Sequence, residues 1–171
     1  GRPLHVYDAA RLEGGLVARR ARPGETLDAL NGRTYALDAR MTVIADEARA
    51  HGIAGIMGGT ASAVSAETRA VVIECAWFDP VRIGAAGRAL GLMSDARQRF
   101  ERGVDPAFVG PGLDLAAAMV RELCGGTVSA RVEAGCPPLQ PRTIQFDPAR
   151  TRTLGGIDLP PEPQRAILER L

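Results

Sequence analysis

The sequence contains no lysine. All 21 of its basic residues are arginine, and with 20 acidic residues they leave a net charge of +1. The absence of lysine excludes a Walker-type phosphate loop, a Schiff-base lysine and a lysine general base from this chain. The small net charge provides no global field that would attract nucleic acid. Arginine nevertheless binds phosphate and stacks on bases, so contact with RNA is compatible with this composition.

Cysteine and histidine are scarce. The three cysteines, Cys75, Cys124 and Cys136, form no Cys-x-x-Cys pair and no zinc-ligand spacing with histidine, and an odd count disfavours a disulfide framework. We therefore expect buried, reduced thiols, a cytoplasmic location and no metal site in this segment. The sequence has two histidines and no Gly-x-Ser-x-Gly motif, which disfavours a serine nucleophile with a histidine base.

Long apolar runs are also absent. No stretch approaches the roughly 18 apolar residues that a membrane span requires, and no signal peptide is present. The sequence therefore predicts no association with a membrane. A hydrophobic content of 46% and a charged content of 24% are typical of a globular domain.

The order of predicted elements indicates an α+β fold. The first 78 residues read as strands, and Asn31-Gly32 between two short runs is a strong hairpin signal. Two or three helices follow, before a further strand at 127–133. We expect a mixed β-sheet core covered by two helices, with a partial second domain at the C-terminus. The expected strands are 16–22, 26–30, 33–37, 41–45, 52–59 and 71–78, and the expected helices are 79–91, 94–102 and 111–124.

A proline-rich stretch divides the chain. Residues 136–141 contain three prolines and read as a linker between a first domain, 1–135, and a second segment, 142–171. The second segment predicts a strand at 142–146 and a helix from about Pro161, which is too little to close a core of its own. The chain starts without methionine and stops within a helical pattern, so we expect an excerpt of a longer protein whose first domain is truncated at its N-terminus.

Two features of the first domain suggest a binding site. Glu74 lies within the β-branched and aromatic run 71–78, where a charge is costly to bury unless it is paired. It is either one half of a core ion pair with an arginine or a buried acceptor for a hydroxyl or amine of a ligand. The glycine-rich stretch 52–59 is either a bulged strand or bare backbone that a ligand can approach, and its spacing does not fit a dinucleotide-binding loop.

Four motifs resemble the β subunit of bacterial phenylalanyl-tRNA synthetase, in the order and at the spacing of that family. They are RPLHVYD (2–8), IAGIMGG (53–59), IECAWFDPVRI (73–83) and GLMSDARQRFERGVDP (91–106). The resemblance covers residues 1–135, which match the editing module of that subunit, while residues from about 142 resemble the start of a winged-helix-like module. Arg2 and Arg97 depart from the family pattern and add arginine near the expected pocket mouth, either for the tRNA acceptor end or for surface ion pairs.

The resemblance implies a role in an α2β2 enzyme that joins phenylalanine to tRNA(Phe) with ATP and magnesium. The aminoacylation site lies in the α subunit, so no cofactor is expected in this segment. The matching module hydrolyses tyrosine that has been mischarged onto tRNA(Phe). A second site is useful because an apolar pocket rejects an added hydroxyl only weakly, whereas a site that requires the hydroxyl discriminates by about 10⁴ to 10⁵.

The same resemblance assigns roles to five residues. Glu74 matches the carboxylate that accepts the tyrosine hydroxyl, Gly55 matches a pocket-floor glycine, and Ser94 and Ala96 match positions that line the pocket. His5 matches a histidine near the aminoacyl ester, where it orients water or the terminal ribose without a covalent intermediate. Two alternatives are a module that positions tRNA but has lost editing, and a free-standing editing protein, which the linker and the segment after it disfavour.

Overall fold

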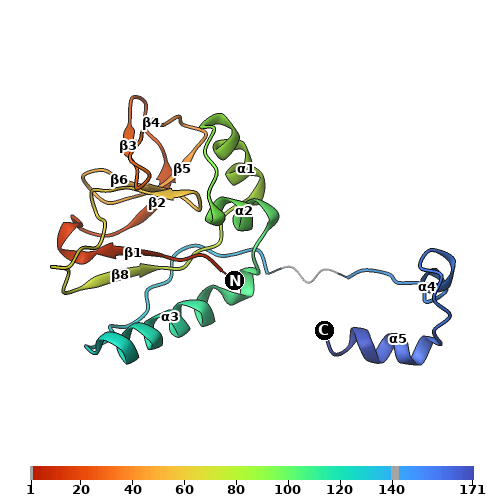
Figure 1. Ribbon diagram of the computed structural model, residues 1–171. Coiled ribbons are helices and arrows are strands. Elements are labelled where there is room, and N and C mark those ends of the chain that lie inside the picture. The colour runs from red at the N-terminus through yellow and green to blue at the C-terminus, as the bar shows by residue number, and fades with distance from the viewer. Residues whose placement is uncertain (1, 140–142) are drawn as a thin grey trace. The chain divides into compact units, whose positions relative to one another are not determined.

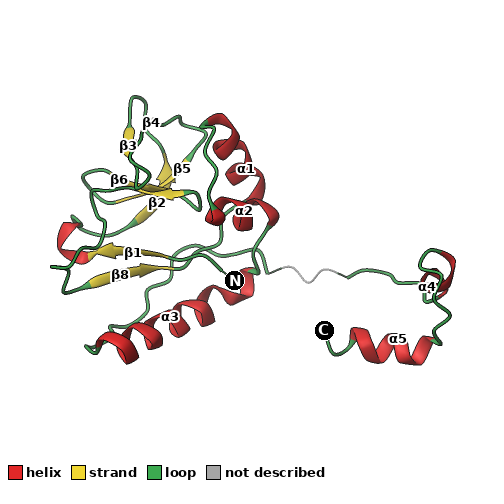
Figure 2. Cartoon of the chain, in the orientation of Figure 1, coloured by secondary structure: helices red, strands yellow, loops and turns green. Residues whose placement is uncertain are grey.

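The computed structural model describes residues 2–139 and 143–171, and the chain forms two compact units, 1–139 and 140–171. The described elements comprise eight strands and five α-helices, so the predicted α+β class is confirmed (Figure 2). The boundary between the units falls within the proline-rich stretch predicted as a linker, of which Gln140 and Pro141 lie outside the described residues. Within the two described ranges, no helix is both long enough and apolar enough to cross a bilayer.

The strands of the first unit belong to three sheets, and every described pairing is antiparallel (Figure 1). The largest sheet has four strands in the order β2-β5-β6-β7. A separate hairpin pairs β3 with β4 through Asn31-Gly32, where Gly32 adopts a φ of 77°, so the hairpin signal in the sequence is confirmed. The bounds are β2 Val17–Arg20, β3 Thr26–Asp28, β4 Thr34–Ala36, β5 Thr42–Ala45, β6 Ala50–Ile53 and β7 Met57–Gly58.

The glycine-rich stretch forms a tight hairpin rather than one bulged strand. Strands β6 and β7 pair through Gly52 with Gly58 and through Ile53 with Met57. Gly55 lies in the turn between them with a φ of 67°, a backbone conformation that favours glycine over any other residue. The register shift in this sheet lies elsewhere, between β5 and β6.

The third sheet joins segments that are far apart in the sequence. Strand β1 (His5–Asp8) pairs with β8 (Val71–Glu74), so that His5 lies directly opposite Glu74. The predicted strand 71–78 extends four residues too far. Continued pairing would place Pro3 opposite Ala76, and proline has no N–H to donate. The Arg2 side chain donates to the Ala76 carbonyl oxygen instead, at 2.6 Å.

Two capped helices cover the four-stranded sheet. Helix α1 (Pro80–Ala89) begins after Asp79, whose carboxylate accepts hydrogen bonds from the backbone N–H groups of Val81 and Arg82. Helix α2 (Asp95–Arg102) begins after Ser94, whose hydroxyl accepts from the Arg97 N–H. Both helices contribute to the main core cluster, which brings Ile83, Ala86 and Phe100 together with Val43 and Ile53. A third helix, α3 (Val109–Cys124), lies beside β8 (Figure 1).

A smaller apolar cluster lies under the β1–β8 sheet. Tyr7, Ile44 and Ala54 form it, and Phe78 packs against both this cluster and the main core. The Phe78 and Phe100 rings meet edge to face with centroids 5.2 Å apart. Phe78 therefore connects the β1–β8 sheet to the helices.

Three further predictions fail. Residues 127–133 form no strand: they are exposed and pair with no described strand, and Arg131 pairs instead with Asp114 of α3 at 2.7 Å and with Glu133 at 2.8 Å. Residues 143–146 also form no strand, and Arg142, the first residue of that predicted strand, lies outside the described residues. The expectation of buried thiols is wrong for Cys124 and Cys136, which are exposed.

The second unit contains two short helices, α4 (Ala149–Thr153) and α5 (Pro161–Leu168). The predicted helix from Pro161 is confirmed. Buried Gln164 holds the unit together: its amide donates to the Leu159 carbonyl at 2.6 Å and accepts from the Thr151 hydroxyl at 2.7 Å. The winged-helix-like character of this segment stays a prediction.

Candidate functional site

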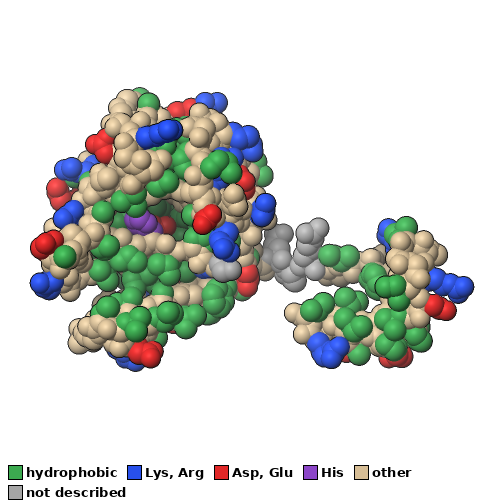
Figure 3. Space-filling view, viewed as in Figure 1, with side chains coloured by type: hydrophobic (Ala, Val, Ile, Leu, Met, Phe, Trp, Pro, Cys, Tyr) green, Lys and Arg blue, Asp and Glu red, His purple; other side chains and the backbone are tan. Residues whose placement is uncertain are grey.

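A cavity opens between the β1–β8 sheet, the β6–β7 hairpin and helix α2. Its volume is about 80 Å³, several times the roughly 10–15 Å³ that one ordered water needs. In Figure 3 a histidine is visible in a hollow among hydrophobic side chains. The lining includes four of the five residues singled out in the sequence, namely His5, Gly55, Glu74 and Ala96, together with Tyr7 and Gly58.

Glu74 is the only charged side chain in the lining. It accepts a hydrogen bond from the Tyr7 hydroxyl, with Oε2 lying 2.5 Å from that oxygen. Burial raises the pKa of Glu74, and the hydrogen bond from Tyr7 opposes that rise. Among residues 2–139 and 143–171 the carboxylate forms no ion pair with an arginine, so the core ion pair that the sequence left open is not observed. A half-buried carboxylate with one protein donor can accept further hydrogen bonds.

His5 lies across the sheet from Glu74, because the antiparallel register pairs the two residues directly. Its Nε2 atom is buried and has no hydrogen-bond partner in the described part of the chain. Burial lowers the pKa of His5, which favours a neutral imidazole at neutral pH. The ring lies against Gly58, where an added Cβ would be 2.8 Å from Nε2. His5 and Glu74 thus place a neutral ring nitrogen and a carboxylate in one apolar cavity.

Gly55 contributes backbone to the pocket and leaves space for the core beneath it. A Cβ at this position would lie 2.9 Å from Cδ2 of Phe78 and 3.1 Å from Cδ1 of Ile83 and Cδ2 of Phe100. The side-chain space that glycine leaves empty is therefore filled by the core rather than by the cavity. Gly55 shapes the pocket by letting these side chains pack against the turn.

Ala96 lines the cavity, whereas Ser94 does not belong to its lining. The Ser94 hydroxyl donates to the Ile56 carbonyl at 2.6 Å and accepts from the Arg97 backbone N–H at 3.1 Å. One side chain therefore caps α2 and fastens it to the β6–β7 turn. Ser94 acts on the pocket by fixing where Ala96 lies.

The two arginines that depart from the family pattern have internal roles. Arg97 is only 6% exposed, and its guanidinium donates to the Leu92 carbonyl at 2.6 Å and pairs with Glu101 at 3.0 Å. Arg2 donates to the Ala76 and Asp105 carbonyl oxygens. Arg97 therefore forms a buried ion pair rather than a surface one. The guanidinium groups of both Arg97 and Arg2 make hydrogen bonds within the fold.

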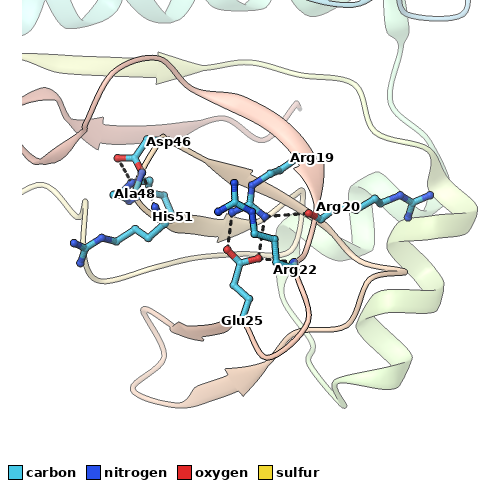
Figure 4. Close-up of polar contacts among 8 residues, drawn as sticks. Arg19, Arg20, Arg22, Glu25, Asp46, Ala48 and His51 are labelled. Atoms are coloured by element: carbon cyan, nitrogen blue, oxygen red, sulfur yellow. Dashed lines mark hydrogen bonds and ion pairs between the residues drawn. The ribbon is translucent and has the colours of Figure 1, made fainter.

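Sequence reasoning missed a buried polar pair behind the pocket. Asp46 and His51 lie 2.7 Å apart and their side chains are each 1% exposed (Figure 4). Burial alone would raise the pKa of Asp46, but hydrogen bonds from the backbone N–H groups of Glu13 and Arg49 and from His51 outweigh it and hold that pKa well below its ordinary value. The His51 ring meets the edge of Tyr7 with centroids 6.3 Å apart, so the pair supports the wall that carries Tyr7.

A second, more exposed ion pair fastens the sheet nearby. Arg19 of β2 makes two hydrogen bonds to the Glu25 carboxylate, at 2.6 and 2.9 Å (Figure 4).

The sequence signal that could have identified Asp46 is an aspartate placed directly after a strand and before a turn, a position where carboxylates often accept hydrogen bonds from backbone N–H groups. No sequence pattern indicated that His51 is the partner of Asp46.

The arrangement suits an apolar or aromatic side chain that carries one hydrogen-bond donor. The cavity wall is mostly hydrophobic, and Glu74 provides the single charged acceptor. None of the lining residues is serine, threonine, cysteine or lysine, so the lining offers no conventional covalent nucleophile apart from its histidine, tyrosine and carboxylate. The described residues contain no group of three histidine, cysteine or acidic side chains suited to a metal ion.

Curated proteins are similar to this chain over its whole length. The chain is 54% identical over 171 residues to the phenylalanine–tRNA ligase beta subunit of Novosphingobium aromaticivorans and 51% identical over 171 residues to that of Zymomonas mobilis, which covers 100% of this chain and 22% of each relative. The beta subunit of Paramagnetospirillum magneticum is 50% identical over 170 residues, 99% of this chain and 21% of the relative. The chain thus spans about a fifth of the length of these curated relatives. Residues 1–125 match the B3/4 domain, and the chain belongs to that family.

Proposed function

We propose that this chain is the editing segment of a phenylalanine–tRNA ligase β subunit and that its cavity hydrolyses tyrosine mischarged onto tRNA(Phe). The observation that carries the proposal is Glu74, a half-buried carboxylate in a largely apolar cavity with one hydrogen bond from the protein. The names of the relatives support the ligase. In that enzyme, which acts in the cytoplasm, a partner α subunit of an α2β2 assembly binds ATP and magnesium and charges phenylalanine.

Glu74 supplies the selectivity in this proposal. Tyrosine is phenylalanine with one added hydroxyl, and that hydroxyl donates to the Glu74 carboxylate when the ring enters the cavity. Phenylalanine displaces water from the carboxylate and offers no donor in return. The loss of a hydrogen bond to a buried charged group costs about 1.5–3 kcal/mol, so the site favours the hydroxylated ring.

Hydrolysis itself needs a positioned water. The water oxygen attacks the ester carbonyl carbon, the bond from that carbon to the ribose oxygen breaks, and the ribose oxygen takes a proton. His5, whose pKa is lowered by burial and whose Nε2 has no hydrogen-bond partner in the described part of the chain, orients the water or the terminal ribose hydroxyl. No covalent intermediate is part of this scheme.

The test measures hydrolysis of tyrosyl-tRNA(Phe) and phenylalanyl-tRNA(Phe) by the whole enzyme that carries this segment. Glu74→Ala removes the acceptor, and Ala96→Trp fills the cavity; each should lower tyrosine hydrolysis by about 10- to 100-fold while phenylalanine charging is retained. Ala85→Trp makes the same substitution at an exposed position of α1 and should leave hydrolysis unchanged. An unmutated enzyme without tyrosine hydrolysis would leave a module that only positions tRNA.

A further inference from the structure

The cavity contains a tyrosine of its own. Tyr7 is 1% exposed, lines the cavity, and donates its hydroxyl to Oε2 of Glu74. It lies on the same face of β1 as His5, two residues away, which places both side chains beside Glu74 of the neighbouring strand. The donor that bonds to Glu74 within the protein is therefore a phenol, the same group that the proposed substrate carries.

The Tyr7 ring is held from two sides. His5 meets it at a centroid distance of 4.5 Å and an interplanar angle of 65°, and His51 meets it at 6.3 Å and 76°. Ile44 and Ala54 complete its cluster. Burial, and then the charge and hydrogen bond of Glu74, raise the pKa of Tyr7 far above its ordinary range. Its hydroxyl therefore stays protonated around neutral pH and can donate to Glu74.

We propose that Tyr7 is a specificity-determining residue of this pocket: its hydroxyl is a resident donor that fixes Oε2 of Glu74 and leaves the other carboxylate oxygen for the hydroxyl of a phenolic ligand. This inference rests on the proposed editing function. A carboxylate has about four lone-pair sites, so two phenols can donate to it together. Tyr7 removes rotational freedom from the acceptor before the ligand arrives, which is the usual advantage of a preorganised site.

Tyr7 also favours the ionised form of the Glu74 acceptor. Its hydrogen bond is the contact that opposes the effect of burial on the pKa of Glu74. An ionised Glu74 excludes phenylalanine because that ring leaves a charge without its second donor, whereas a protonated Glu74 carries no such penalty. Selectivity for tyrosine should therefore fall on acidification. Without the Tyr7 hydroxyl, burial acts unopposed and the fall should begin at a higher pH.

Few other titratable groups face Glu74. His5 lies opposite it on β1, and Cys75, with Arg2 nearby, follows it in the chain. The lining residues from β6, β7 and α2 carry no titratable side chain, and the Asp46–His51 pair lies behind Tyr7. His5 is thus the main competing source of a pH dependence, and a variant that removes only the titration of Glu74 separates the two.

The experiment uses the whole enzyme and the ratio of kcat/KM for tyrosyl-tRNA(Phe) to that for phenylalanyl-tRNA(Phe), measured from about pH 5 to about pH 8. Tyr7→Phe should shift the loss of selectivity to higher pH, so that the ratio is about tenfold lower than that of the unmutated enzyme on the acid side of neutrality. Glu74→Gln should give a low ratio at every pH, because glutamine does not ionise and any remaining pH dependence would then come from another group such as His5. Tyr35→Phe removes the other tyrosine hydroxyl of the chain, which accepts from Asn31, and should follow the unmutated enzyme.

Charging of phenylalanine by each variant reports that the enzyme is folded. If Tyr7→Phe fails to fold, Glu74→Asp serves instead, because the shorter side chain withdraws the carboxylate from Tyr7 and should shift the profile in the same direction. A profile of Tyr7→Phe that superimposes on that of the unmutated enzyme would overturn the role of Tyr7 and leave the editing proposal intact. Absence of tyrosine hydrolysis in the unmutated enzyme would overturn both.

Discussion

Replacement of Gly55 by alanine should destabilise the first unit by about 2–5 kcal/mol. Two costs add. A φ of 67° is unfavourable for a residue with a Cβ by about 1–2 kcal/mol. The new methyl group would also lie 2.9 Å from the Phe78 ring and 3.1 Å from Ile83 and Phe100, and overpacking of this kind costs about 1–3 kcal/mol.

Gly32→Ala is the matched control for this prediction. Gly32 has a similar φ of 77°, but no atom outside its chain neighbours lies within 4 Å of an added Cβ. Gly32→Ala should therefore cost only the conformational term, about 1–2 kcal/mol. Urea unfolding of the 171-residue chain, followed by the fluorescence of Trp77, the single tryptophan, measures the difference. Equal losses of unfolding free energy in the two variants would refute the packing argument. Gly55 would then matter only because it leaves room for a ligand.

Three further substitutions test other parts of the structure. Gly58→Ala should displace the imidazole of His5 and lower tyrosine hydrolysis by about tenfold, with less than about 1 kcal/mol of lost stability in the same urea assay, because the obstructed group is a side chain. Arg97→Met should lower the free energy of unfolding by about 3–5 kcal/mol, since it leaves the Leu92 carbonyl and the Glu101 carboxylate without their buried partner. A loss of about 1 kcal/mol or less, typical of exposed ion pairs, would contradict this. Asp46→Asn should cost about 2–3 kcal/mol at pH 7. The pKa of Asp46 is lowered by folding, so its contribution is present above about pH 4 and is lost as the pH falls further, and the two unfolding curves should converge on acidification.

Local signals in the sequence were sufficient for the turns and the helix starts. Asn31-Gly32 predicted a hairpin, and Asp79-Pro80 and Ser94 predicted helix N-termini, because each of these structures is stabilised by contacts within four residues. A neighbouring residue in the chain is always available to make such contacts. Prediction therefore succeeded where the partner of each group lies close in sequence.

Strand lengths were predicted less well, because a strand ends where its partner ends. The run 71–78 is hydrophobic throughout, yet only Val71–Glu74 pairs, since Pro3 on the opposite strand cannot donate. Residues 127–133 have a strand composition but no described neighbour with which to pair. The partners that decide these outcomes lie dozens of residues away, and a single sequence does not reveal them.

The candidate site shows the same division at the level of single residues. A carboxylate in a hydrophobic strand identified Glu74 as unusual, but its partner, Tyr7, is 67 residues away, and no local pattern around Tyr7 indicates that contact. That partner changes the energetics of selection. An acceptor with no donor of its own would reject a ring without a hydroxyl by the full cost of an unpaired buried charge, whereas Glu74 keeps one donor whichever ring is bound. The selectivity of this pocket is then set by the second hydrogen bond alone, so it should be smaller than that of the Tyr7→Phe enzyme at any pH high enough to keep Glu74 ionised in both.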